Sequence, residues 1–172
     1  RWLKKNNYKF LSPFDLEKIA RGEESFPKGA VLLSVDDGWL SNEVNIVGVA
    51  EKYGVPVTIF VTSGAVEDGA YWWSYVAKAR KLGLRVPSKA SLKKLTNDEK
   101  LSVVEKLKPT VVLPREALTI EQVKQISESE YITIGGHTHT HPILINCKKQ
   151  VVYDELRLSR QKLETWTEKE VS

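Results

Sequence analysis

Three short apolar runs stand out in the hydrophobic pattern of the chain. They are "AVLLSV" at residues 30–35, "VPVTIFV" at residues 55–61 and "YITIGG" at residues 131–136. The first two are rich in β-branched residues and nearly continuous in apolar character, which is typical of strands buried on both faces. We therefore expect three strands, each followed by a polar segment at its carboxyl end.

The segments between these runs have helical periodicity. Residues 40–53 carry apolar side chains at helical spacing, namely Val44, Val47, Ala50 and Tyr53. "LTIEQVKQISES" begins a helix with Thr119 as its cap and Gln122 at the capping-box position. Residues 147–170 read as a long amphipathic helix. Alternating strands and helices predict an α/β fold with a parallel sheet.

Two further regions complete the predicted layout. Ser12-Pro13 is typical of a helix N-cap with proline at the first helical position. Residues 71–108 read as two helices, more than a plain crossover requires, and we interpret them as an insertion. We find no repeat or linker, so residues 1–172 form a single predicted domain. Three βα units either make a small open sheet or begin a barrel whose remaining strands lie outside this sequence.

Composition and charge exclude several classes of protein. An apolar content of 41% and a charged content of 28% are typical of a globular domain, and no apolar run approaches the roughly 20 residues of a membrane span. The net charge of +4 comes from scattered lysines without interleaved aromatics, which argues against nucleic-acid binding. The chain contains no methionine and opens without an apolar signal segment, so we expect a processed or partial sequence.

The single cysteine, Cys147, excludes an internal disulfide and a multi-cysteine zinc cage. We expect it to be a small buried apolar residue. The aromatic cluster formed by Tyr71, Trp72, Trp73 and Tyr75 is predicted to pack in the core rather than to form a sugar platform.

All three histidines lie at the exit of the third predicted strand, in "HTHTH" at residues 137–141. The preceding Gly135-Gly136 and the following Pro142 disfavour a helix. In an extended segment side chains alternate, so the three imidazoles would share one side of the chain. This pattern indicates a candidate metal site, although the spacing alone leaves structural histidines as an alternative.

Asp36 and Asp37 directly follow the first predicted strand, as the histidines follow the third. Since the carboxyl ends of parallel strands share one edge of the fold, we expect these carboxylates to meet the histidines. Alone, "DDG" is equally a turn and helix-cap signal. Two imidazoles and one carboxylate suit Zn²⁺ with an open position for water, and a second carboxylate can accept the proton of that water. Such a site hydrolyses amides or esters.

Both motifs also resemble those of a known family. "SVDDG" is similar to the first motif, T/S-F-D-D-G, of the polysaccharide deacetylase family, also called the NodB homology or carbohydrate esterase 4 family. "HTHTHP" is similar to its second motif, H-S/T-x-x-H-P. The resemblance extends over about residues 8–170. It implies an α/β fold, a deformed (β/α) barrel of the NodB type, of which this chain holds only the N-terminal βα units.

The resemblance implies a role for each matching residue. Asp36 would be the general base, and Asp37, His137 and His141 would bind a divalent metal ion, with Zn²⁺ as the expected ion. Thr138 would support the loop by hydrogen bonding, and Trp39 would line the cleft. His139 falls on a variable position of the motif and would only neighbour the site.

The resemblance also implies a substrate and a location. The expected activity is metal-dependent removal of acetyl groups from an N- or O-acetylated polysaccharide, in the bacterial cell envelope or outside the cell. The family's later motifs, including an L-x-H with the catalytic acid, do not occur in this sequence. Two alternatives stay open: hydrolysis of another C–N bond on the same fold, or a non-catalytic carbohydrate-binding or envelope-assembly module. Uncovered strand edges would require a partner or the rest of the domain.

Overall fold

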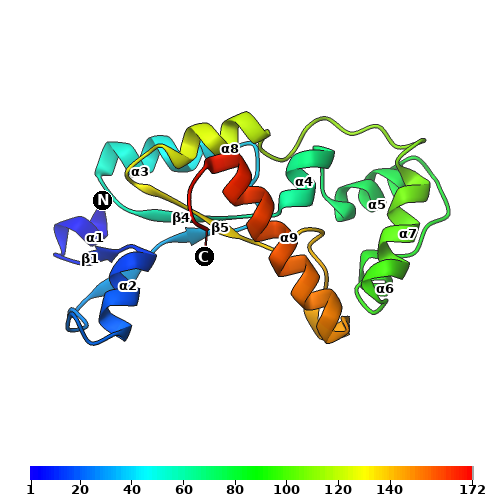
Figure 1. The fold of residues 1–172 in the computed structure, drawn as a ribbon. Coiled ribbons are helices and arrows are strands. Elements are labelled where there is room, and N and C mark those ends of the chain that lie inside the picture. Colours follow the sequence, from blue (N-terminus) through cyan, green and yellow to red (C-terminus); the bar gives the residue numbers. More distant parts are fainter. Residues whose placement is uncertain (172) are drawn as a thin grey trace.

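The computed structural model describes residues 1–171, and its centre is a parallel sheet (Figure 1). Three strands pair in the order β3-β4-β5: Ser34–Val35, Val57–Val61 and Ile132–Gly136. A separate parallel pair joins β1 (Lys9–Leu11) to β2 (Ala30–Leu32). The predicted α/β class and parallel pairing are confirmed. Within the described residues the strands do not close into a barrel.

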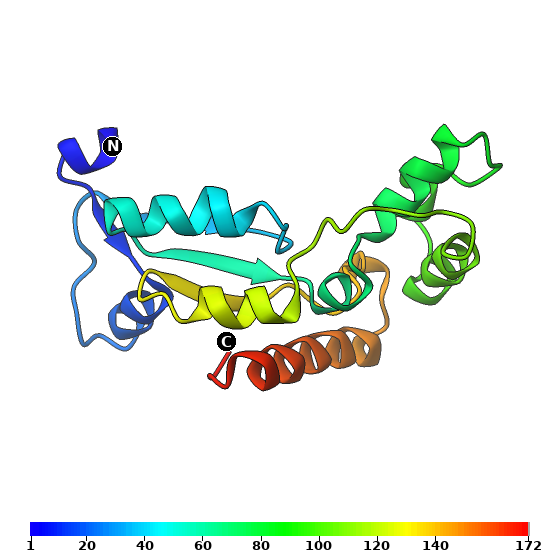
Figure 2. The same cartoon turned by 90° about the horizontal axis from the view of Figure 1, so that it is seen from above.

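Helices cover one face of the three-stranded sheet. Helices α3 (Gly48–Tyr53), α8 (Ile120–Ser127) and α9 (Lys149–Thr167) run beside the strands (Figures 1 and 2), and buried residues of all three share one core with Ile59 and Ile134, which are cross-strand partners on that face. Helix α8 packs against both β5 and α9. The core between these elements includes Ile59, Val61, Val123, Ile126 and Leu163, all of which are buried. This packing fixes the carboxyl ends of β3, β4 and β5 at one edge.

The predicted helix caps are present. The Ser12 side chain accepts the amide of Asp15 at the start of α2 (Pro13–Ala20), and the Asp15 carboxylate accepts the Ser12 amide in return. Thr119 and Gln122 form the same reciprocal pair at the start of α8. Each pair satisfies amides that a helix start otherwise leaves without partners.

The prediction of one doubly buried strand over residues 30–35 is wrong. The run divides at Leu33 into β2 and β3, which belong to different sheets, and Leu32 and Ser34 are exposed. The physical reason is a change of partner: β2 pairs with β1, whereas β3 pairs with β4. Each part is an edge of its sheet among residues 1–171, so only some of its apolar surface is covered.

The helix predicted over residues 40–53 begins with a wide turn. Residues Glu43–Val47 form a π-helix (η1), which continues as α3. Val47 and Ala50 are buried as predicted, but Val44 is 75% exposed. A π turn takes more residues than an α turn, so it rotates Val44 out of the α-helical register.

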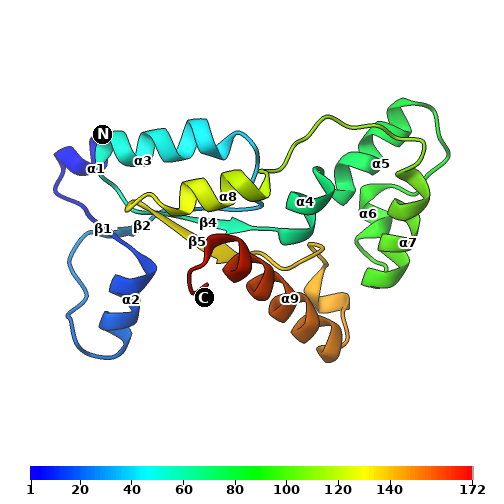
Figure 3. The same ribbon diagram turned by 45° about the horizontal axis from the view of Figure 1, so that its top comes forward.

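The segment predicted as an insertion forms three helices rather than two: α5 (Trp72–Lys81), α6 (Lys89–Leu92) and α7 (Asn97–Leu107). They share their own apolar cluster, which includes Val76, Leu92 and Val104. Figure 3 shows them at one end of the molecule, beyond α4 (Ser63–Asp68). Helices α4 and α6 have too few residues to display a periodic pattern. The single-domain assignment of residues 1–172 stays a prediction.

Short elements complete the chain: α1 (Trp2–Lys5) at the start and a 3₁₀ turn, η2 (Leu144–Asn146), before α9. Among the helices of residues 1–171, none combines the length and the apolar character needed to cross a membrane.

Candidate metal centre

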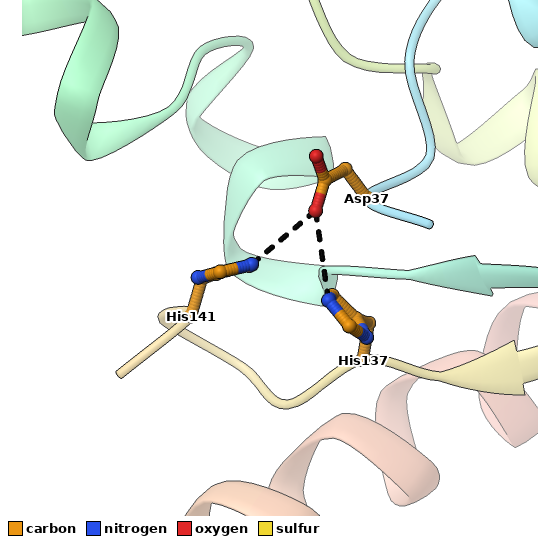
Figure 4. A group of neighbouring side chains, drawn as sticks. All are labelled: Asp37, His137 and His141. Carbon is orange, nitrogen blue, oxygen red and sulfur yellow. Dashed lines mark ion pairs between the residues drawn. The ribbon is translucent and has the colours of Figure 1, made fainter. Parts of the chain in front are cut away.

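Asp37, His137 and His141 come together at the carboxyl edge of the sheet, although about a hundred residues separate the first from the other two. Asp37 follows β3 and the histidines follow β5 (Figure 4). Oδ1 of Asp37 lies 3.6 Å from Nε2 of His137 and 3.3 Å from Nε2 of His141. One ligand atom from each residue lies within 4.8 Å of the others.

This arrangement fits a divalent metal ion. Zn²⁺ binds imidazole nitrogens and carboxylate oxygens at about 2.0–2.1 Å, and two such atoms around a tetrahedral ion are roughly 3.3 Å apart. The two separations between Asp37 and the histidines are close to this value. All three side chains are half-buried, so the centre is partly open to solvent.

The backbone around the centre is strained. Asp37, Thr138 and His141 have φ angles of 76°, 62° and 53°, in the left-handed region that non-glycine residues seldom adopt. Each such residue costs about 1–2 kcal/mol. Strain of this kind gathers at functional sites and persists only where the surrounding structure enforces it.

The same turns show that the predicted alternation of the three histidines is wrong. The segment after β5 is not extended, because Thr138 and His141 turn the chain. His139 faces away from Asp37, and its Nδ1 lies 2.9 Å from Oγ of Ser63. Two imidazoles, not three, therefore face the carboxylate.

Backbone hydrogen bonds from the end of β4 and the start of α4 hold both loops. The amide of Thr62 donates to the carbonyl of Asp37 at 3.1 Å, and the amide of Gly64 donates to the carbonyl of His139 at 2.8 Å. The approach at Gly64 is so close that an added Cβ would lie 2.6 Å from the carbonyl oxygen of His139. Only glycine fits here without moving the histidine loop.

Gly64→Ala is expected to lower the free energy of unfolding by about 1–3 kcal/mol, as overpacking does, because the new methyl group meets backbone rather than a flexible side chain. Gly48→Ala is the matched control: Gly48 has a φ of −59°, and a Cβ added there would meet nothing within 4 Å, so alanine is expected to add about 0.5–1 kcal/mol. Urea unfolding of both variants measures the difference. Equal stability of Gly64→Ala and the parent would contradict the close approach.

Three predicted residues flank the candidate metal-binding group. Asp36 is exposed and is not one of the three clustered residues. Trp39 donates from Nε1 to Oδ2 of Asp37 at 3.0 Å, which leaves Oδ1 directed at the histidines. Thr138 donates from its hydroxyl to the carbonyl of His137 at 2.5 Å. The roles assigned to these residues stay predictions.

The charges suit metal binding. The hydrogen bond from His141 is the main cause that lowers the pKa of Asp37, with Trp39 acting in the same direction against burial. Burial is the main cause that lowers the pKa of His137, and it outweighs the opposing effect of the carboxylates of Asp36 and Asp37. An ionised carboxylate and neutral imidazoles are the forms that bind metal.

The aromatic residues near the site do more than the sequence indicated. Tyr71, Trp72 and Tyr75 are buried, as predicted. Tyr71 also donates to the carbonyl of Asp37 at 3.3 Å, and Trp72 donates to the carbonyl of His141 at 3.2 Å. Trp73 stacks on Tyr71 with 4.7 Å between ring centroids and meets the His141 ring edge-on at 4.8 Å. The only sequence signal was their position soon after the second strand.

Cys147 does not take part in the centre. It is partly exposed rather than buried as predicted, and its sulfur lies 3.5 Å from the carbonyl of Ile143. It follows the short turn η2, whose own residues Leu144 and Ile145 are exposed.

The α/β fold and the Asp-His-His group at the carboxyl edge of its sheet are typical of a metal-binding protein. Comparison with known proteins identifies the family. The family model for polysaccharide deacetylase matches residues 23–172. The chain therefore belongs to the polysaccharide deacetylase family, the NodB or carbohydrate esterase 4 group. A comparison with curated proteins gives no significant match.

Solved structures share the fold. The Streptococcus pyogenes deacetylase PplD, in complex with acetate, matches with a TM-score of 0.66 and 19% identity over 98% of this chain and 55% of that chain. The BpsB deacetylase domain from Bordetella bronchiseptica gives 0.65 and 14%, over 99% and 63%. IcaB from Ammonifex degensii gives 0.62 and 16%, over 99% and 59%. The chain thus spans between half and two thirds of the length of these structures.

Proposed function

We propose that this protein is a metal-dependent hydrolase that removes acetyl groups from an N- or O-acetylated polysaccharide. The observation that carries the proposal is the convergence of His137 and His141 on Oδ1 of Asp37, in a chain of the polysaccharide deacetylase family. Zn²⁺ is the ion we assign, because two imidazoles and a carboxylate are typical zinc ligands.

Different residues of the chain would bind the metal ion, orient its ligands and accept a proton. A divalent ion in this position supplies Lewis acidity, which acidifies water and polarises an acetyl carbonyl. Asp37, His137 and His141 hold the ion, and Trp39 keeps the Asp37 carboxylate in orientation. Asp36 follows β3 directly and is exposed, so its carboxylate is free to accept the proton of the attacking water.

Membership of the family supports the proposed substrate class and location. A carbohydrate polymer is the proposed substrate, and the bacterial envelope or the extracellular space is the proposed location. The neighbour from Streptococcus pyogenes was solved with acetate, the second product of a deacetylation. Hydrolysis of another C–N bond and a non-catalytic carbohydrate-binding module are the competing proposals.

Acetate release distinguishes these functions. The intact protein, loaded with zinc, is incubated with chitin oligosaccharides, peptidoglycan and acetylated xylan. We expect acetate from at least one of them, loss of the activity after chelation, and its return when zinc is added. A protein that binds zinc stoichiometrically but releases no acetate from any acetylated glycan would instead support the binding module.

A further inference from the structure

A buried carboxylate on α9 binds the loop that joins the two histidine ligands. Glu155 is only 7% exposed. Its Oε2 accepts the amides of His139 and Thr140 at 2.8 and 2.7 Å, and its Oε1 accepts the Thr140 hydroxyl at 2.5 Å. Asn97, on α7, donates to the same Oε1 at 3.2 Å. One side chain therefore receives four hydrogen bonds, three of them from the histidine loop.

These hydrogen bonds stabilise the part of the loop between the two histidine ligands. His139 and Thr140 stand between the ligands His137 and His141, in a segment that belongs to no strand or helix. Backbone amides in such a segment require a partner when water is excluded. Hydrogen bonds to an ionised carboxylate are stronger than neutral ones, so Glu155 stabilises a loop conformation that the strained residues Thr138 and His141 would otherwise oppose.

Helix α7 also binds this loop. Lys100 is 1% exposed and donates from Nζ to the carbonyl of His141 at 2.9 Å, while lying 4.9 Å from the ring centroid of Trp72. Asn97 also donates to the Thr140 hydroxyl at 3.0 Å. The helical segment after α4 is thus joined to the metal centre, although none of its residues is a ligand.

We propose that Glu155 is a positioning residue for the metal ligands: together with Asn97 and Lys100, it fixes residues 137–141 so that two imidazoles face Asp37. The inference rests on the proposed metal site. Removal of a residue that hydrogen-bonds to a metal ligand or its loop typically weakens metal binding 10–100-fold. A residue that only stabilises the fold would change the melting temperature and leave the zinc affinity of the folded protein unchanged.

Zinc titration of the chelator-treated protein tests the proposal. Isothermal titration calorimetry, well below the melting temperature of each variant, compares Glu155→Ala with Asp154→Ala, which removes the neighbouring exposed carboxylate of the same helix. We expect roughly 10–100-fold weaker zinc binding for Glu155→Ala and parental affinity for Asp154→Ala. Hydrogen exchange at the amides of His139 and Thr140 should also accelerate in Glu155→Ala, whereas exchange in β4 should not.

Glu155→Gln is the conservative variant. Its amide oxygen can accept both backbone amides, and Asn97 can turn its own amide, because Oδ1 of Asn97 has no hydrogen-bond partner within residues 1–171. We expect most of the zinc affinity to return. Recovery no better than in Glu155→Ala would contradict the geometry of these bonds.

The possible failures are distinguishable. If the parent protein binds no zinc, the metal site itself is wrong, and the positioning role with it. If the parent binds zinc and folded Glu155→Ala binds it equally well, only the positioning role is overturned. Should Glu155→Ala not fold, Lys100→Met carries the test, since it keeps an unbranched apolar side chain of similar length and removes the ammonium group that donates to His141 and lies over the ring of Trp72. Unchanged zinc affinity in that variant would overturn the proposal.

Discussion

Replacement of Asp36 by asparagine is expected to lower the rate of acetate release by the intact protein about 10²–10⁴-fold while zinc stays bound. The structure places Asp36 beside the Asp-His-His group but outside it, exposed and directly after β3. Asparagine has nearly the same shape but cannot accept a proton at neutral pH. The rate constant and the zinc content are measured on the same preparation.

The control for this variant is Asp154→Asn, which changes an exposed carboxylate on α9. We expect it to retain full activity. Near-normal hydrolysis by Asp36→Asn would show that the base is another residue. Loss of zinc together with activity would instead place Asp36 among the ligands and contradict the division of roles between Asp36 and Asp37.

The second large effect concerns zinc itself: His137→Ala is expected to reduce bound zinc from one ion per chain to almost none. Removal of an imidazole leaves Asp37 and His141 as the only protein ligands of the group. The loss should exceed the 10–100-fold that removal of a supporting residue costs. Metal analysis after dialysis against a weak chelator measures it.

The chain provides its own control in His139. This residue lies two positions away in the same loop, but its ring faces Ser63. His139→Ala should therefore keep its zinc. Equal zinc content in His137→Ala and the parent would contradict the proposed ligand set, and loss of zinc in His139→Ala would show that the loop is arranged differently.

The meeting of the Asp36-Asp37 pair with the histidine segment was predictable because it depends on topology, whereas the choice of Asp37, His137 and His141 came from the resemblance to the family's motifs. Parallel strands place their carboxyl ends at one edge, and two polar motifs followed two predicted strands. The caps at Ser12 and Thr119 were predictable for a different reason, since a capping box is a local feature of four residues. Caps of this kind need no knowledge of distant contacts.

The conformation of the histidine loop was not predictable, because distant residues enforce it. The left-handed turns at Thr138 and His141 depend on hydrogen bonds from Gly64 and to Glu155. Alternation would apply only if the segment continued as a strand. The division of residues 30–35 between two sheets likewise depends on which strands pair, and the apolar pattern does not specify partners.

The sequence contained a weak indication that Glu155 is buried. It begins a series on α9 spaced by four residues, Glu155, Ser159, Leu163 and Thr167, and all four are buried. An acidic residue on the buried side of an amphipathic helix requires partners for its charge. The sequence could therefore have indicated that Glu155 is bound within the protein, but not that the histidine loop binds it.

Anomalous diffraction at the zinc edge tests the central claim most directly. Crystals of the zinc-loaded protein should give one strong anomalous peak, about 2.0–2.2 Å from Oδ1 of Asp37 and from Nε2 of His137 and His141. A peak coordinated by His139 or Cys147 instead, or no peak at this edge of the sheet in a protein that binds one zinc ion, would contradict the account.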